Sequence, residues 1–256
     1  MRILIINPNT TARMTEAIAR AGRRAASAGT EIIAVNPADG PISIEGYYDE
    51  AFSVPGLLAE IAKGEAIGVS AHVIACFDDT GLEAARSASL APVIGIGEAA
   101  FHLASMLGHR FSVITTLSRS IAVIENNLLK YGLASRCTSV KACELPVLSL
   151  DDPTSDAAAK IGVEIELAKQ EDKAEVIVLG CAGMAELAAR LAARHGVPVI
   201  DGVASAVKLA EALSALGYKT SKIGAYALPR PKPYLGALAA FGTHETFNEA
   251  DAFDHP

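Results

Sequence analysis

The sequence predicts an α/β protein of two pseudo-symmetric lobes, each a parallel sheet sandwiched between helices, with an active site in the cleft between them. Three observations lead to this prediction. Short β-branched runs alternate with Ala-rich amphipathic stretches, the second half of the chain repeats the first, and 51% of the 256 residues are hydrophobic. Such alternation is typical of βαβ units in a parallel sheet, and the apolar content suffices for a large core.

The first half of the chain supplies three pairs of a strand and a following helix. The pairs are 3–6 with 14–26, 31–35 with 57–63, and 73–75 with 82–88. The first strand has four apolar residues before Asn-Pro, too few for a signal peptide or a membrane span. We therefore expect a cytoplasmic protein that does not contact membranes.

The second half repeats this pattern and carries a cysteine at the same point of it. Cys76 and Cys181 each end a buried, β-branched run. A helical stretch follows each of them, and then a Pro-Val-Ile strand that begins 16 residues after the first cysteine and 17 after the second. Upstream, the strand at 3–6 is matched by one at 111–114. The repeat predicts two similar lobes with equivalent cysteines.

We place the first lobe at 1–105 and the second at 106–219. A C-terminal segment at about 220–256 is expected to return to the first lobe or to cross between the lobes. The segment contains Pro-Arg-Pro-Lys-Pro-Tyr at 229–234, ends acidic and lacks periodicity. A subunit contact or a frayed end is expected there.

The two repeated cysteines indicate catalysis. Ligands of parallel α/β sheets bind beyond the carboxyl ends of the strands, so Cys76 and Cys181 should face each other across one cleft. Free N–H groups at 77–79 and 182–184 should favour anions, lower a thiol pKa toward neutrality and hold an enolate oxygen. One acid and one base on opposite faces of a carbon acid are what racemisation requires. Cys137 and Cys143, in contrast, are expected to fill space.

Four motifs resemble the Asp/Glu/hydantoin racemase superfamily and, within it, its hydantoin racemases. They are Cys76-Phe-Asp-Asp-Thr-Gly, Gly-Cys181-Ala-Gly-Met, the opening Ile-Asn-Pro-Asn-Thr and the closing Pro-Arg-Pro-Lys-Pro-Tyr. The resemblance covers all but about the last dozen residues. It implies two flavodoxin-like lobes, no cofactor, and racemisation of 5-monosubstituted hydantoins or allantoin, by two-base proton transfer between the cysteines at C5 of the hydantoin ring. It also implies a homo-oligomer, commonly a tetramer or hexamer.

The residues after the first cysteine depart from the amino-acid racemases of the superfamily, which typically have Asn-Thr there. Phe77-Asp78 instead fits a neutral cyclic ureide better than a charged amino acid, with Phe77 lining a pocket or filling core. Amide, hydroxyl and main-chain groups nearby could bind the ureide edges, although capping or turn roles are the alternative for the polar ones. The candidate substrate-binding residues are Pro8, Asn9, Ser43, Ile44, Phe77, Asp78, Thr115, Thr116, Gly180, Ala182 and Gly183.

Other classes of site have little support. The net charge of −7 with scattered basic residues argues against nucleic acid and anionic membranes as partners. The cysteines and histidines lack the spacing of a metal site or a disulfide framework. Gly95-Ile-Gly-Glu-Ala-Ala100 matches a dinucleotide fingerprint, but the next strand ends in Thr115-Thr116 rather than an acidic residue. We expect neither a metal nor a cofactor.

Several alternatives stay open. Allantoin racemase, an Asp/Glu amino-acid racemase, and a related isomerase or decarboxylase would all share the fold. A decarboxylase of this superfamily needs one of the two cysteines, so the presence of both favours racemisation. A different class is a two-lobe small-molecule binding protein without catalysis, whose thiols would be inert to alkylation near neutral pH.

Overall fold

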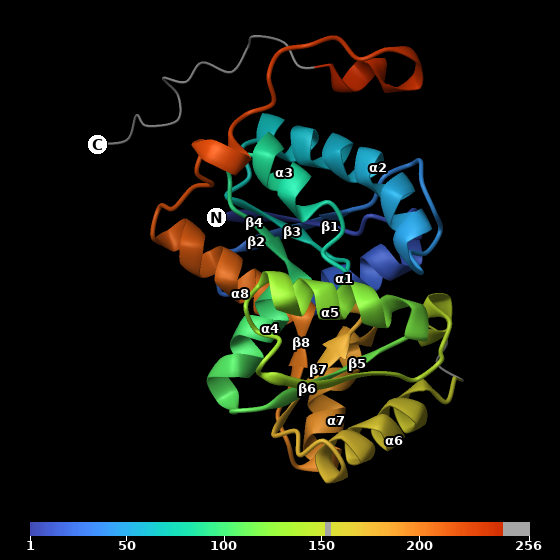
Figure 1. Ribbon diagram of the computed structural model, residues 1–256. Coiled ribbons are helices and arrows are strands. Elements are labelled where there is room, and N and C mark those ends of the chain that lie inside the picture. The colour runs from blue at the N-terminus through green and yellow to red at the C-terminus, as the bar shows by residue number, and fades with distance from the viewer. Residues whose placement is uncertain (152–154, 243–256) are drawn as a thin grey trace.

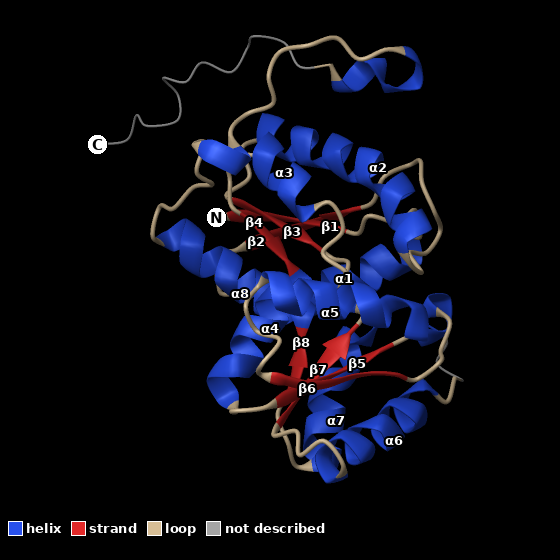
Figure 2. Ribbon diagram, in the orientation of Figure 1, coloured by secondary structure: helices blue, strands red, loops and turns tan. Residues whose placement is uncertain are grey.

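The computed structural model describes residues 1–151 and 155–242, and it contains two four-stranded parallel sheets (Figures 1 and 2). The strand orders are β2-β1-β3-β4 and β6-β5-β7-β8, so the two sheets have the same topology. The predicted α/β architecture of two similar lobes is confirmed. The strands are β1 Arg2–Ile6, β2 Glu31–Val35, β3 Ala71–Ile74, β4 Val93–Gly95, β5 Phe111–Thr115, β6 Cys137–Ala142, β7 Val176–Gly180 and β8 Val199–Asp201.

Helices cover both faces of each sheet (Figure 2). The α-helices are α1 Ala12–Ala25, α2 Tyr47–Ala66, α3 Leu82–Ala88, α4 Ile96–Leu107, α5 Ile121–Lys130, α6 Ala157–Gln170, α7 Ala188–His195 and α8 Gly202–Ala215. Short 3-10 helices are η1 Ser118–Ser120, η2 Val147–Asp151, η3 Ala182–Leu187, η4 Gly224–Tyr226 and η5 Gly236–Phe241. No helix in the described part of the chain is both long and apolar enough to span a lipid bilayer.

The central strand β1 shows why apolar runs form these sheets. Its side chains alternate between two cores: Ile3 and Ile5 join the cluster that includes α1 and α8, whereas Leu4 and Ile6 join the cluster of α2. A strand with period-two side chains, covered by helices on both faces, buries every residue. Continuous β-branched runs therefore mark the strands of this fold.

The two lobes exchange a helix (Figure 1). Helix α4 follows β4 of the first sheet but packs against β7 and β8 of the second, and α8 follows β8 but packs against β3 and β4 of the first. One hydrophobic core consequently runs through both lobes and includes α4, α8, and strands of both sheets. Helix α4 spans the predicted boundary between residues 105 and 106 and packs on the second sheet. The division of the chain at this boundary therefore stays a prediction.

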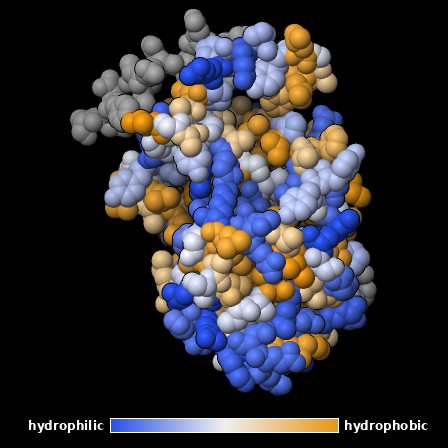
Figure 3. Space-filling model, in the orientation of Figure 1, coloured by the Kyte–Doolittle hydropathy of each residue, from blue (hydrophilic) through white to orange (hydrophobic). Residues whose placement is uncertain are grey.

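The described part of the C-terminal segment has two portions. Thr220 and Lys222 hydrogen bond to the first lobe, through Thr220 N to Leu90 O at 3.0 Å and Lys222 Nζ to Arg86 O at 2.6 Å. Beyond residue 227 the chain projects away from the two lobes, and its described part ends just after η5. Apolar side chains lie at the tip of this projection (Figures 1 and 3). The expected acidic end, residues 245–256, lies outside the described residues.

Candidate active site

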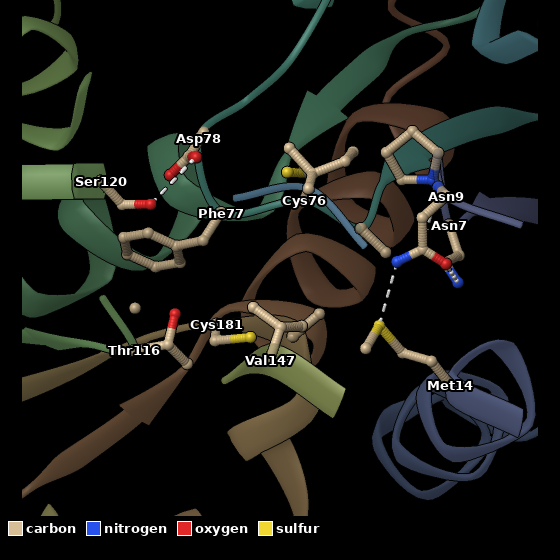
Figure 4. A pocket seen from close by; sticks show the side chains of 15 residues that line it. Asn7, Asn9, Met14, Cys76, Phe77, Asp78, Thr116, Ser120, Val147 and Cys181 are labelled. Carbon is tan, nitrogen blue, oxygen red and sulfur yellow. Dashed lines mark hydrogen bonds between the residues drawn. The ribbon is translucent and has the colours of Figure 1, made fainter. Parts of the chain in front are cut away.

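The two repeated cysteines line one pocket between the lobes (Figure 4). Cys76 follows β3 and Cys181 follows β7, which are equivalent strands of the two sheets. Both cysteine residues are partly exposed. The topology therefore brings together two residues 105 positions apart, as the repeat predicts.

The turn after β1 forms one wall of the pocket. Asn7 Nδ2 donates to Asn9 Oδ1 at 2.8 Å and to Thr15 Oγ1 at 3.0 Å, and Asn9 Nδ2 contacts Met14 Sδ at 3.2 Å (Figure 4). These bonds satisfy buried amide groups that would otherwise be costly to desolvate. They fix the turn against the first helix and leave Pro8 in the lining.

The environment of Cys76 differs from expectation. Burial raises the pKa of its thiol well above the ordinary value and the charge of Asp78 raises it further, while a 3.4 Å hydrogen bond from Thr80 Oγ1 lowers it. Desolvation penalises a thiolate more strongly here than nearby donors favour it. The predicted lowering of this pKa toward neutrality is therefore wrong, since the surroundings of Cys76 raise it.

Two of the donors expected to be free are occupied. Asp79 N donates to Cys76 O at 3.1 Å, and Met184 N donates to Cys181 O at 3.0 Å. Both bonds close tight turns directly after the cysteines, the second at the start of η3. These turns hold each thiol at the end of its strand.

Asp79 anchors the Cys76 loop to the exchanged helix α4. Its carboxylate accepts hydrogen bonds from Gly97 N at 2.9 Å, Glu98 N at 2.7 Å and the Tyr131 hydroxyl at 2.8 Å. A Cβ at Gly95 would overlap this carboxylate, and one at Gly97 would lie 2.8 Å from it. The glycines of the dinucleotide-like motif thus make room for a side chain that caps a helix.

Asp78 faces the pocket and is held by the second lobe. Asn127 Nδ2 donates to its main-chain oxygen at 2.8 Å, and Ser120 Oγ lies 3.5 Å from Oδ2 (Figure 4). Burial, followed by the charges of Glu50 and Asp79, raises the pKa of the Asp78 carboxyl to about 7. At neutral pH this side chain is present in both its protonated and ionised forms.

Most of the residues predicted from the sequence line this pocket. They are Pro8, Asn9, Ile44, Cys76, Phe77, Asp78, Thr116, Gly180, Cys181 and Ala182. Three others lie outside the lining: Ser43, Thr115, whose hydroxyl donates to Gly180 O at 3.1 Å, and Gly183, which packs against Leu150.

Five lining residues were absent from the predicted set: Asn7, Met14, Ala75, Ser120 and Val147. Asn7 and Ala75 belong to the strand ends already identified, and their position beside Pro8 and Cys76 is the signal that could have found them. Met14 and Ser120 lie on a helix and a short 3-10 turn, where sequence gives no indication of the direction of the side chain.

The ionisable side chains in the lining of the pocket all become negatively charged when they ionise. Among residues 1–151 and 155–242, the lining includes no lysine, arginine or histidine, and its ionisable side chains are the two cysteines and Asp78. The described residues also hold no cluster of three His, Cys, Asp or Glu side chains suited to a metal ion. Apolar side chains of Met14, Ile44 and Val147 complete the wall. Such a site suits an uncharged molecule with an apolar substituent.

Comparison with known proteins points to one family. The sequence model described as Asp/Glu/Hydantoin racemase matches residues 3–210. The chain is 54% identical over 236 residues to "Hydantoin racemase" of Rhizobium meliloti, covering 92% of this chain and 98% of that protein. It is 48% identical over 246 residues to "Hydantoin racemase" of Pseudomonas sp. (strain NS671), covering 96% and 99%.

A solved structure is similar as well. "Allantoin racemase from Klebsiella pneumoniae" superposes with a TM-score of 0.93 and 46% sequence identity, covering 95% of this chain and 100% of that chain. The similarity extends through both lobes.

Proposed function

The chain belongs to the Asp/Glu/hydantoin racemase family and is an isomerase, and we propose that it racemises 5-monosubstituted hydantoins by proton transfer between Cys76 and Cys181. The observation that carries the proposal is the equivalent placement of two thiols, one from each lobe, in a pocket to which the described part of the chain contributes no cationic side chain. Relatives named hydantoin racemase at 41–54% identity support the substrate class.

The chemistry needs one thiolate and one thiol. The thiolate of one cysteine takes the C5 proton, so that an S–H bond forms, and the C5–H electron pair moves onto the neighbouring carbonyl oxygen as an enolate. The thiol of the other cysteine then returns a proton to the opposite face of C5, and its own S–H bond breaks. The two cysteines exchange roles, so one turnover prepares the enzyme for the opposite enantiomer.

The charge of the pocket favours a hydantoin over an amino acid. An α-carboxylate would have to lie near Asp78 and a thiolate with no lysine or arginine in the lining to compensate, and buried like charges repel strongly. A hydantoin is uncharged in its ground state. The apolar side chains of Met14, Ile44 and Val147 favour an alkyl or aryl group at C5, whereas the ureido group of allantoin is polar.

We expect the protein to racemise separate L- and D-5-benzylhydantoin in D2O, with solvent deuterium appearing at C5. Optical rotation and the C5 proton signal measure inversion and exchange, and samples without enzyme correct for spontaneous racemisation. Allantoin, aspartate and glutamate are the comparison substrates. A higher kcat/KM for allantoin would move the assignment to allantoin racemase. Activity on none of these compounds would contradict racemisation and favour a binding protein.

We further propose a cytoplasmic homo-oligomer, a tetramer or hexamer. Its support is the projecting C-terminal segment, where Leu235 is 85% and Leu238 is 46% exposed, since apolar side chains on an extended segment are typical of subunit contacts. The four cysteines without disulfides suit a reducing compartment. Sedimentation velocity should give a mass of four or six chains of 26.5 kDa each, and a monomer at micromolar concentration would contradict the proposal.

A further inference from the structure

Asp78 is the one carboxyl group that the described residues contribute to the lining of the pocket, and its surroundings are unusual. The residue is 8% exposed. From the described part of the chain, one hydrogen bond reaches its carboxyl group, and at 3.5 Å from Ser120 Oγ it is long. Figure 4 shows Asp78 on the same side of the pocket as Cys76, with Cys181 on the facing side. The carboxyl group therefore has hydrogen-bonding capacity left for a bound substrate.

The groups that face Asp78 all become anionic when they ionise. They are Glu50 on α2, Asp79 in the same loop, and the Cys76 thiol. Glu50 Oε1 is buried and has no hydrogen-bond partner in the described part of the chain. With no lysine, arginine or histidine in the lining, an ionised Asp78 would meet these charges uncompensated.

Proton abstraction increases the electrostatic repulsion that an ionised Asp78 would meet. When a thiolate removes the C5 proton, its negative charge moves to the carbonyl oxygen of the substrate and stays in the same pocket. An ionised carboxylate beside that oxygen would oppose the reaction, whereas a protonated carboxyl group would donate a hydrogen bond that strengthens as the charge develops. The same side chain is thus inhibitory in one protonation state and helpful in the other.

We propose that Asp78 is a catalytic residue that acts as a protonated acid, donating a hydrogen bond to the substrate carbonyl oxygen adjacent to C5 while that oxygen carries the enolate charge. The proton stays on Asp78 throughout, so that only the two cysteines transfer protons to and from carbon. The raised pKa of Asp78, caused first by burial and then by Glu50 and Asp79, supports this role. The inference rests on the proposed racemisation and adds a third group to it.

The test compares kcat/KM of Asp78→Asn and wild type from pH 6 to 8.5, for both enantiomers of 5-benzylhydantoin. An asparagine keeps the size and a hydrogen-bond donor but cannot ionise. The ratio of variant to wild type should be constant below pH 7 and then increase about tenfold per pH unit, since only the wild type loses its donor. Because the charge of Asp78 also raises the pKa of Cys76, the infrared titration described below identifies which group is responsible for the change in the ratio. A ratio that does not change with pH would overturn the proposal.

Two further variants separate this role from a structural one. Asp79→Asn removes one of the charges that raise the Asp78 pKa but leaves the Asp78 carboxyl group in place, so its ratio to wild type should decrease, rather than increase, as the pH rises through 7. Asp78→Ala removes the donor and should lower kcat by roughly 10²–10³-fold at pH 6, with a circular dichroism spectrum like that of the wild type. Activity of Asp78→Ala within tenfold of wild type at pH 6 would also overturn the proposal.

Infrared difference spectroscopy provides a reading that does not depend on turnover. The wild-type spectrum minus that of Asp78→Asn should contain a carboxylic acid band that converts to carboxylate near pH 7. If the wild type were inactive on every hydantoin but showed this band, the proposed function would fail while the protonated state of Asp78 stood. If the band were absent at pH 6, the acid role would fail whatever the activity.

Discussion

Replacing either Cys76 or Cys181 by alanine is expected to abolish racemisation of both enantiomers. Each turnover needs a base on one face of C5 and an acid on the other, and the pocket offers one thiol from each lobe. Losing a positioned acid or base typically lowers a rate by roughly 10²–10⁴-fold, and the loss should appear in kcat.

Each single variant should keep the exchange of the C5 proton for one enantiomer and lose inversion at C5. A variant with one cysteine can still remove the C5 proton of the enantiomer that presents it to that cysteine, and return deuterium from solvent to the same face. In D2O, Cys76→Ala should therefore exchange one enantiomer without inversion, and Cys181→Ala should exchange the other. Proton NMR with chiral chromatography measures exchange and inversion separately.

Cys137→Ala is the matched control. Cys137 is half-buried in β6, its thiol donates to Ser139 O at 3.3 Å, and it is not part of the pocket lining. Its racemase activity should equal that of the wild type. Near-normal racemisation by Cys76→Ala or Cys181→Ala would rule out the two-base mechanism.

Replacing Phe101 by alanine is expected to cause the largest loss of stability. Phe101 of α4 is fully buried, and its ring lies 5.3 Å from that of Phe77, 6.1 Å from Phe111 and 6.3 Å from Tyr131. Emptying such a site leaves a cavity between aromatic rings from both lobes, which typically lowers the free energy of unfolding by about 3–5 kcal/mol. Urea denaturation at a fixed protein concentration measures the change.

The same substitution should reduce activity, because Phe77 follows Cys76 directly and loses its edge-to-face partner. Phe52→Ala removes an equal side chain that is 60% exposed, and its free energy of unfolding should stay within about 0.5 kcal/mol of wild type. A loss below about 1 kcal/mol for Phe101→Ala would show that the ring cluster does not hold the lobes together.

The sequence predicts the strands and the two cysteines because both are encoded locally. A β-branched run such as 176–180 cannot be mistaken for a surface helix, and the repeat identifies Cys181 as the equivalent of Cys76 without knowledge of distances. The flanking residues were harder to predict. Thr115 ends β5 and its hydroxyl donates to Gly180 O, whereas Thr116 follows the strand and lines the pocket, a difference that two adjacent threonines do not reveal in the sequence.

The electrostatics of the site depend on tertiary packing and could not be predicted from local sequence. The main-chain donors after Cys76 suggest a lowered thiol pKa, but burial and the charge of Asp78 raise it. The largest part of that effect is desolvation by burial. Glu50 is far from the motifs in sequence, and its charge raises the pKa of Asp78 because the fold brings α2 near the pocket.

The helix exchange between the lobes has a consequence for the synthesis of the chain. As the polypeptide leaves the ribosome, β1 to β4 are complete by residue 95, but the face of β3 and β4 that α8 covers stays open until residues 202–215 emerge. Domains usually fold one after another during translation, whereas here the first half waits for the last helix of the second. A nascent chain of this protein therefore exposes an apolar sheet face for more than a hundred residues of elongation, and either half, expressed alone, would leave its part of the shared core uncovered.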